Sequence, residues 1–249
     1  MVNSVSVNLI VPGFSTSSPL ASAYVFGLAS QILVRSDKYI LFDVGHLPTR
    51  RMLIEGLRRL ELNPKLIDCI VLSHLHGDHV LNIDLFRDSE VIVGDAEFIY
   101  AKSPRDDDLA TPRFITDILE EMDLRRVSNG YKVAENVVVM EVPGHTAGSL
   151  SLVIDLPIGR AILAGDALTN IQCIKLGRPL LVFWDEKQAT ESLKRIVEAG
   201  DILYPGHGIP ARRINGDWKY IGSVNVDFSF FPYGFDRDFN MHIHYNVQY

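Results

Sequence analysis

A cluster of metal-binding side chains directly follows an apolar segment in the first half of the chain. Residues 73–79 read SHLHGDH, and residues 66–72 before them read LIDCIVL. The apolar run is short and rich in β-branched residues, which predicts a buried strand that delivers its end to a loop. Imidazole and carboxylate groups are the ligands that zinc and similar divalent metals take. A metal site therefore explains this segment better than a surface loop, with four donors: His74, His76, Asp78 and His79.

Three later segments repeat the pattern of an apolar run, a Gly or Pro, and one donor. The donors are His145 in PGHTAGS, Asp166 in AGD and His207 in YPGHG. The glycines permit the tight turns and close backbone approach that a crowded site requires. Either histidine alone would be better explained as a loop residue. Together with the first cluster, the recurrence favours metal ligation.

These motifs, in this order, resemble those of the metallo-β-lactamase fold superfamily of hydrolases, and they extend from Asp43 to His207. The resemblance implies two metal ions. One would be bound by His74, His76 and His145, the second by Asp78, His79 and His207, and Asp166 would bridge both. The segment FDVG is similar to a strand-end motif of the family, which implies that Asp43 supports the ligand loop from behind.

Departures from the motifs exclude two branches of the superfamily. Diiron flavoproteins of the superfamily carry Glu where this chain has His76, and glyoxalase II-like enzymes add a helical domain that the segment after His207 does not resemble. The family often has glycine where this chain has Asn82. The closest resemblance is to small single-domain metallo-β-lactamase-domain-containing proteins, to some of which nuclease or phosphoesterase activity is attributed.

The resemblance implies a mixed α/β (α+β) fold, a four-layer αββα sandwich, and residues 1–249 are expected to form one domain with an aromatic-rich tail at 214–249. Apolar periodicity and turn residues predict alternating elements, with two halves that meet near residue 130. Strands are expected at 5–11, 31–43 (with a turn at 36–38) and 90–94, and helices at 49–60, 95–101, 114–122 and 185–199. A helix is also expected to start near Asp78 and run through 80–86, and 103–108 reads as a polar loop.

Composition is that of an ordinary globular enzyme, with 47% hydrophobic and 22% charged residues. The net charge of −7 disfavours nucleic acid as a partner and favours a small-molecule substrate. No leader peptide and no membrane-spanning run is evident, and the two cysteines need no disulfide, so a cytoplasmic location is expected. Five aromatic side chains within 228–235 would form a large exposed patch, which predicts a homo-oligomer or a covered pocket wall.

The implied reaction is hydrolysis by metal-bound hydroxide at a dinuclear centre, since two close cations lower the pKa of bound water toward about 7. Asp78 would orient that hydroxide, and the metals are expected to be zinc, with iron or manganese as alternatives. Phosphodiesters and phosphotriesters are favoured as substrates. The alternatives are a carboxylic ester, lactone or thioester, and, in another class, a mononuclear iron persulfide dioxygenase. Lys175 and Arg178 are candidate substrate contacts, whereas Glu97, Glu120 and Glu121 read as solvated helix faces.

Overall fold

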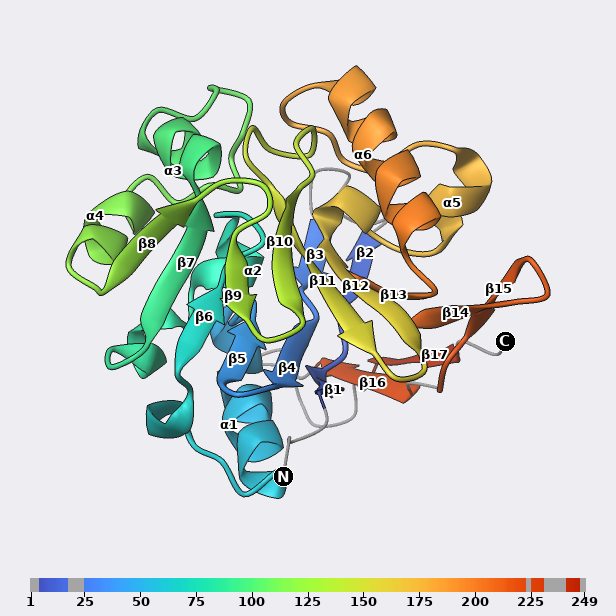
Figure 1. Cartoon of the computed structure of the whole chain (residues 1–249), viewed down its shortest axis with the longest axis horizontal. Coiled ribbons are helices and arrows are strands. Elements are labelled where there is room, and N and C mark those ends of the chain that lie inside the picture. The colour runs from blue at the N-terminus through green and yellow to red at the C-terminus, as the bar shows by residue number, and fades with distance from the viewer. Residues whose placement is uncertain (1–4, 18–24, 223–224, 231–240, 247–249) are drawn as a thin grey trace.

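The computed structural model describes residues 5–17, 25–222, 225–230 and 241–246, with side chains described for 5–14 and 27–222. Within this part of the chain two sheets pack face to face and helices cover both outer faces (Figure 1). This four-layer arrangement is the αββα sandwich that the family resemblance implies.

The first sheet is six-stranded and contains most of the N-terminal half of the chain. Its strand order is β1-β4-β5-β6-β7-β8. The inner strands pair in parallel from β5 to β8, while β1, β4 and β5 are antiparallel. The bounds are β1 Ser6–Val11, β4 Gln31–Arg35, β5 Tyr39–Phe42, β6 Cys69–Val71, β7 Glu90–Gly94 and β8 Leu124–Val127.

The second sheet is seven-stranded, with the order β15-β14-β13-β12-β11-β10-β9. Only the pairing of β12 with β13 is parallel among its described ladders. The bounds are β9 Lys132–Ala134, β10 Val137–Glu141, β11 Leu150–Leu156, β12 Gly159–Gly165, β13 Ile202–Pro205, β14 Ala211–Ile214 and β15 Asp217–Tyr220. The chain changes sheet between β8 and β9, which confirms the predicted boundary near residue 130.

Alternation along the strands explains the two-sheet core. In β4 and β5, Leu33 and Leu41 face the helices, whereas Ile32 and Phe42 face the other sheet, because successive strand residues point to opposite faces. The inner core joins them to side chains of the second sheet, including Val139. Both faces of each sheet are therefore apolar, and each fully buried Leu or Phe contributes about 1.5–3 kcal/mol.

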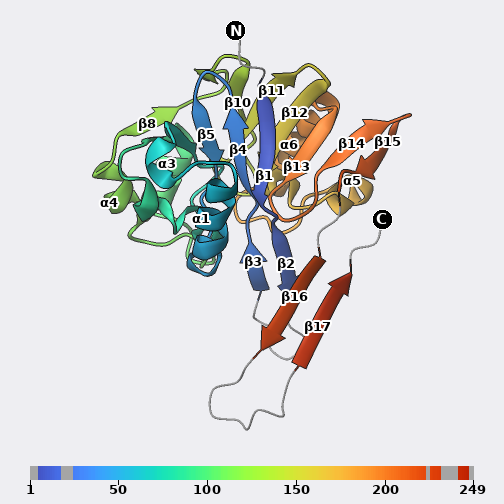
Figure 2. The ribbon, with the colours of Figure 1, turned by 90° about the horizontal axis from the view of Figure 1, so that it is seen from below.

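Helices complete the outer layers. The first sheet is covered by α1 Arg50–Arg59, α3 Asp95–Lys102 and α4 Ile115–Glu120, and the second by α5 Gln172–Leu176 and α6 Glu186–Ala199 (Figures 1 and 2). Asp185 caps α6, since its Oδ1 accepts a hydrogen bond from Gln188 N (2.7 Å), and α6 ends before Gly200. α1, α3, α4 and α6 lie where the apolar spacing predicts helices, whereas the short α5 was not predicted.

The predicted helix after the histidine cluster is shorter than expected. It consists of the four-residue α2 Gly77–Val80 and a separate 3₁₀ turn at Ile83–Phe86. Buried Asn82 separates the two, because its side chain donates hydrogen bonds to the carbonyls of Val44 (3.0 Å) and His46 (2.8 Å). Asn82 thus ties the loop after β5 to α2, which explains a polar residue where the family often has glycine.

Two hairpins extend from the same side of the two-sheet body (Figure 2). One is β2 Phe14–Ser17 with β3 Val25–Leu28, and the other is β16 Asn225–Phe230 with β17 Met241–Asn246. β17 contains His242 and His244. The aromatic cluster at 228–235 was expected to be covered, but its side chains lie outside the described residues. The same holds for all side chains of β16 and β17. No described helix is long and apolar enough to cross a membrane.

Candidate metal centre

All seven predicted ligands gather at one edge of the two sheets. His74 and His76 follow β6, Asp78 and His79 lie in α2, and His145 lies between β10 and β11. Asp166 follows β12 directly and His207 follows β13. Because strands of both sheets end at this edge, donors that are far apart in sequence converge there, as expected for sites at the carboxyl ends of parallel strands.

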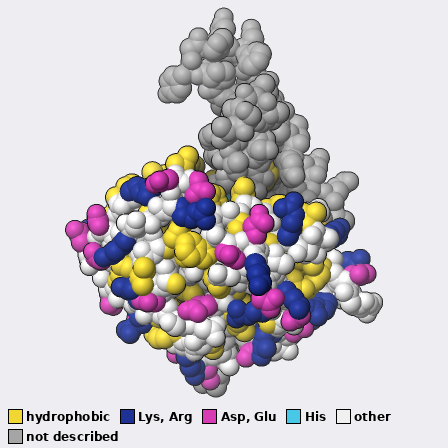
Figure 3. All heavy atoms as spheres, turned by 90° about the horizontal axis from the view of Figure 1, so that it is seen from above, with side chains coloured by type: hydrophobic (Ala, Val, Ile, Leu, Met, Phe, Trp, Pro, Cys, Tyr) yellow, Lys and Arg dark blue, Asp and Glu magenta, His cyan; other side chains and the backbone are white. Residues whose placement is uncertain are grey.

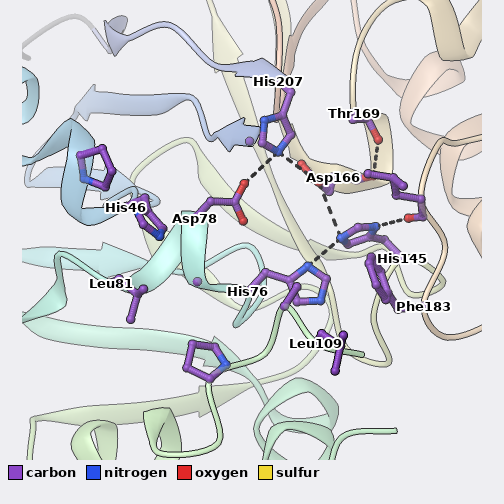
Figure 4. Close-up of a pocket in the computed structure, with 16 residues that line it drawn as sticks. His46, His76, Asp78, Leu81, Leu109, His145, Asp166, Thr169, Phe183 and His207 are labelled. Atoms are coloured by element: carbon purple, nitrogen blue, oxygen red, sulfur yellow. Dashed lines mark hydrogen bonds and ion pairs between the residues drawn. The ribbon is translucent and has the colours of Figure 1, made fainter. Parts of the chain in front are cut away.

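The side chains form two adjacent groups. One consists of His74, His76 and His145, and the other of Asp78, His79 and His207, with the ligand atoms of each group within 4.8 Å of one another. In the first group His76 Nδ1 lies 3.1 Å from His145 Nε2. In the second, His207 Nε2 lies 3.3 Å from Asp78 Oδ2 (Figure 4).

Asp166 lies between the groups. Its Oδ2 is 3.6 Å from His145 Nε2 and 3.3 Å from His207 Nε2, and its Oδ1 is 3.5 Å from His79 Nε2. Asp166 and the backbone of Gly165 leave no room for a larger residue at Gly206, because a Cβ there would lie 2.0 Å from Asp166 Oδ1 and 2.9 Å from the Gly165 carbonyl oxygen. One carboxylate thus faces nitrogens of both groups, the position that a bridging ligand requires.

The donor set fits divalent cations. Buried ligand atoms that lack a hydrogen-bond partner among the described residues include His74 Nε2, His79 Nε2 and Asp166 Oδ1. Buried polar atoms are normally paired, and here several converge on one small volume. Neutral imidazoles and ionised carboxylates that point at each other across 3–4 Å are satisfied together by a cation between them.

Burial and neighbouring charges shift the pKa values of these side chains in opposite directions. Burial holds the pKa of His74 well below its usual range and lowers that of His145 to about 4. Burial also opposes charge on His79, but Asp43, Asp78 and Asp166 outweigh it and raise the pKa of that ring well above its usual range. Burial would raise the pKa of Asp166, but His207 and His79 outweigh it and hold that pKa well below its usual range. His74 and His145 are thus held neutral, as metal ligation requires.

Asp43 lies behind the ligand loop, in the place that the resemblance implies. It is buried and has a φ of 57°. Its Oδ1 accepts a hydrogen bond from Ser73 N (2.7 Å), and its Oδ2 accepts from Ser73 Oγ (2.8 Å) and His79 Nδ1 (2.8 Å). The carboxylate therefore fixes both the start of the loop and the orientation of the His79 ring, so that Nε2 faces Asp166.

Glu97 was expected on a solvated helix face, and this expectation is wrong. The side chain is fully buried. Its Oε1 accepts from Leu75 N (3.0 Å), and its Oε2 accepts from Thr146 Oγ1 (2.6 Å) and Gly148 N (3.0 Å). Leu75 lies between two ligand histidines and Thr146 follows a third, so this carboxylate joins two ligand loops. The α3 sequence alone contains no signal for this, since the partners come from other segments.

The outward-facing nitrogens of two ligand histidines bond to the backbone. His145 Nδ1 donates to the carbonyl of Leu181 (2.5 Å), and His207 Nδ1 lies 3.2 and 3.1 Å from the carbonyls of Phe14 and Leu28 in the β2–β3 hairpin. Such contacts fix the tautomer and direct the opposite Nε2 inward. The same hairpin leaves space for the site only because residue 27 is glycine, as a Cβ there would lie 2.8 Å from Asp78 Oδ2.

A pocket of about 610 Å³ opens over the two groups (Figure 4). Five of the candidate ligands line it, together with His46, Thr169 and an apolar wall that comprises Pro48, Leu81, Leu109, Ala110, Pro112, Leu181 and Phe183. His46 was not singled out from the sequence, because it belongs to no motif and reaches the pocket only through the fold. Lys175 and Arg178 are exposed, and neither lines the pocket.

Comparison with known proteins agrees with this geometry. The sequence profile described as the metallo-beta-lactamase superfamily matches residues 24–207, well over half of the chain. The chain belongs to the metallo-beta-lactamase superfamily. It is therefore a metal-dependent hydrolase, and the prediction from its motifs is confirmed.

Relatives include metallo-beta-lactamase domain-containing protein 1 of Xenopus laevis, which is 25% identical over 84% of this chain and 82% of its own. An N-acyl homoserine lactonase of a Bacillus species is 28% identical over 65% of this chain and 64% of its own. Among solved structures, AidC, a dizinc quorum-quenching lactonase in complex with N-hexanoyl-L-homoserine, superimposes with a TM-score of 0.62 at 16% identity, covering 80% of this chain and 81% of that one.

Proposed function

We propose that the protein hydrolyses carboxylic esters at a dinuclear metal centre, and that a lactone or ester with an apolar arm is its substrate class. The lactonases among its relatives support ester chemistry at carbon. This choice favours the alternative raised from the sequence over the phosphoester that the motifs first suggested.

The proposed ligands are those that the fold brings together. His74, His76 and His145 would hold one ion, Asp78, His79 and His207 the other, and Asp166 would contact both. A majority of imidazole donors with carboxylates favours zinc. Two bound divalent cations would lower the pKa of water toward about 7 and polarise a carbonyl oxygen.

Asp78 is the group that the chain itself offers to the reacting water. It lines the pocket, and its side chain remains 22% exposed, whereas Asp166 and the ligand histidines are nearly inaccessible. Its Oδ2 lies 3.3 Å from His207 Nε2, so the carboxylate is held at the floor of the pocket. We infer that Asp78 accepts and positions a proton of the attacking water.

The apolar wall of the pocket is the observation that best supports this substrate class. Of the described residues that line the pocket, none is Lys or Arg, and the wall is built from Leu, Pro, Ala and Phe side chains. A phosphodiester keeps its negative charge when bound and is usually met by such cations. An uncharged ester needs none, and its hydrocarbon arm gains from contact with the wall.

The one face of the molecule that Figure 3 shows gives no support for a long polyanionic substrate. On the face shown in Figure 3, basic and acidic side chains alternate, and no basic track is visible. The net charge of −7 acts in the same direction. A small molecule is the better fit to the pocket.

A substrate panel tests the proposal. Zinc-loaded protein would be assayed with p-nitrophenyl butyrate, p-nitrophenyl decanoate, a γ-lactone with and without a long acyl arm, and bis(p-nitrophenyl) phosphate. We expect the long-arm lactone or ester to have the highest kcat/KM. A phosphodiester that is cleaved faster than every carboxylic ester would overturn the proposal.

A matched pair of surface leucines tests the apolar wall. Leu109 lines the pocket and is 88% exposed, whereas Leu176 on α5 is 54% exposed and does not line it. Leu109→Ser should raise KM for the decanoate roughly fivefold and leave the butyrate unchanged, since burying part of a Leu side chain contributes about 1 kcal/mol. Leu176→Ser should change neither, and an equal effect of both variants would exclude a local contact.

A further inference from the structure

Asp108 is a buried carboxylate outside every motif of the metal centre. It lies in the loop between α3 and α4, in the stretch expected to be a solvated polar loop, yet its side chain is fully buried. A buried carboxylate is costly unless it is paired. Its partners therefore indicate why the chain holds a charge here.

Its partners lie in two parts of the molecule: α3 with the loop that follows it, and the metal centre. Oδ2 accepts hydrogen bonds from Tyr100 OH (2.7 Å) and Thr111 Oγ1 (2.7 Å), and Oδ1 accepts from Ala110 N (3.0 Å) and Thr111 N (3.2 Å). Oδ1 also lies 3.4 Å from His76 Nε2. One carboxylate thus closes a turn of the loop and faces a metal-centre histidine.

His76 needs such a partner. Its Nδ1 faces the centre, 3.1 Å from His145 Nε2, so Nε2 points away from the ligands. Nε2 is buried and has no hydrogen bond within the described residues, which leaves the Asp108 carboxylate as the acceptor it faces. A carboxylate behind a metal-binding histidine holds the ring in the tautomer whose bare nitrogen points to the metal.

The turn that Asp108 closes forms part of the pocket wall. Leu109, Ala110 and Pro112 line the pocket, and Ala110 O accepts a hydrogen bond from Gly77 N (2.9 Å) at the start of α2. Figure 4 shows Leu109 and His76 on the same side of the pocket. Movement of this turn would therefore change the apolar wall and the support of His76 together.

We propose that Asp108 is a positioning residue that fixes His76 for metal binding. Through the same carboxylate it also fixes the turn that carries Leu109, Ala110 and Pro112, here called the lip, against which the substrate arm packs. The first half of this proposal rests on the proposed metal centre and not on the substrate class. The alternative explanation is that Asp108 only closes the turn and that its approach to His76 has no effect on metal affinity.

Metal binding separates these explanations without any assay of turnover. Zn²⁺ affinity would be measured by competition with a chromogenic chelator on wild type, Asp108→Asn, Thr111→Val and Tyr100→Phe. Asp108→Asn keeps the shape of the side chain and removes its charge, and we expect about 10–100-fold weaker binding of one of two ions. Thr111→Val and Tyr100→Phe each remove one bond to the lip and leave the carboxylate facing His76, so their affinity should stay within about threefold of wild type.

Two outcomes overturn the proposal. One is a folded Asp108→Asn variant with wild-type affinity, and the other is a loss in Thr111→Val or Tyr100→Phe as large as that in Asp108→Asn. Failure of wild type itself to bind Zn²⁺ would instead refute the proposed metal centre. The second part of the proposal, that Asp108 fixes the lip, is tested with the p-nitrophenyl esters named above. Thr111→Val should raise KM for the decanoate more than for the butyrate, and equal changes in both KM values would overturn this part.

A measurement on wild type keeps the proposal testable should Asp108→Asn not fold. In zinc-loaded, ¹⁵N-labelled protein, the histidine ring nitrogens report the tautomer of each ring. We expect His76 to carry its proton on Nε2, facing Asp108, and to present a bare Nδ1 to the metal. A proton on Nδ1 and metal on Nε2 would contradict the assignment.

Discussion

Replacement of Glu97 by glutamine should loosen the two ligand loops that this carboxylate joins. In wild type the carboxylate accepts three hydrogen bonds, from Leu75 N and, at the other oxygen, from Thr146 Oγ1 and Gly148 N. Glutamine has the same shape but presents one acceptor and one donor group. The change therefore alters hydrogen bonding and charge with little change in packing.

The size of the effect follows from the geometry. If the amide oxygen faces Leu75 N, the amide nitrogen meets Gly148 N–H, and if it is turned, the nitrogen meets Leu75 N–H. In either case one buried backbone donor loses its acceptor, which costs about 1–3 kcal/mol, and the remaining bonds weaken because the acceptor is neutral. Burial raises the pKa of Glu97, so removal of the charge offsets part of this loss. We expect a net loss of about 1–3 kcal/mol in the free energy of unfolding.

Urea and thermal unfolding of metal-free protein would measure this, since metal linkage is then absent. The Tm should fall by about 2–4 °C for each kcal/mol in a chain of this size. Glu120→Gln on the exposed side of α4 is the matched control and should stay within about 0.5 kcal/mol of wild type. Thr146→Val, which removes one of the three donors, should fall between the two. A folded Glu97→Gln variant as stable as wild type would refute the role assigned to Glu97.

Three further predictions follow from the described residues. Fully active protein should carry close to two divalent ions per chain by elemental analysis, because seven donors form two groups; one ion per chain, and a single iron above all, would favour the dioxygenase alternative. Asp78→Asn should keep the fold and lose at least about a hundredfold in kcat, the lower scale for a positioned proton acceptor, and wild-type turnover in a metal-loaded variant would remove Asp78 from the mechanism. Burial raises the pKa of Cys69 from 9.0 to about 12, so its protonated thiol stabilises the fold fully below pH 9 and this contribution is lost as the pH rises toward 12. Because Cys173 is buried as well, neither thiol should react with a disulfide reagent at pH 8 faster than the protein unfolds, and rapid labelling of either would contradict that burial.

Local pattern was sufficient for most elements of the fold. The period-2 alternation that places Leu33 and Ile32 on opposite faces of β4 is written in adjacent residues, as is the Asp185 cap of α6. The helix after the ligand cluster was overestimated, since the bonds from Asn82 to Val44 and His46 connect residues almost forty positions apart. A pattern of neighbouring residues does not show such long-range hydrogen bonds, which here end the helix early.

The convergence of the seven candidate ligands was also predictable, for a related reason. Each lies in a segment that follows a strand, so its sequence neighbourhood already shows the apolar run and the glycine turn that deliver it to the edge of a sheet. The positioning carboxylates were not predictable. Glu97 lies in a helix and Asp108 in a polar loop, and both look solvated until the partners from other segments are placed around them.

The sequence by itself thus determined the candidate metal-binding groups and the two-halved alternation of strands and helices. Only the tertiary structure decided what faces those donors from the substrate side. The apolar wall of Leu109, Leu181 and Phe183, the exclusion of Lys175 and Arg178 from it, and the shared carboxylate of Asp108 all depend on loops from distant parts of the chain. Strand periodicity is a property of neighbouring residues, whereas the shape and polarity of a pocket arise from contacts between segments that the sequence does not place side by side.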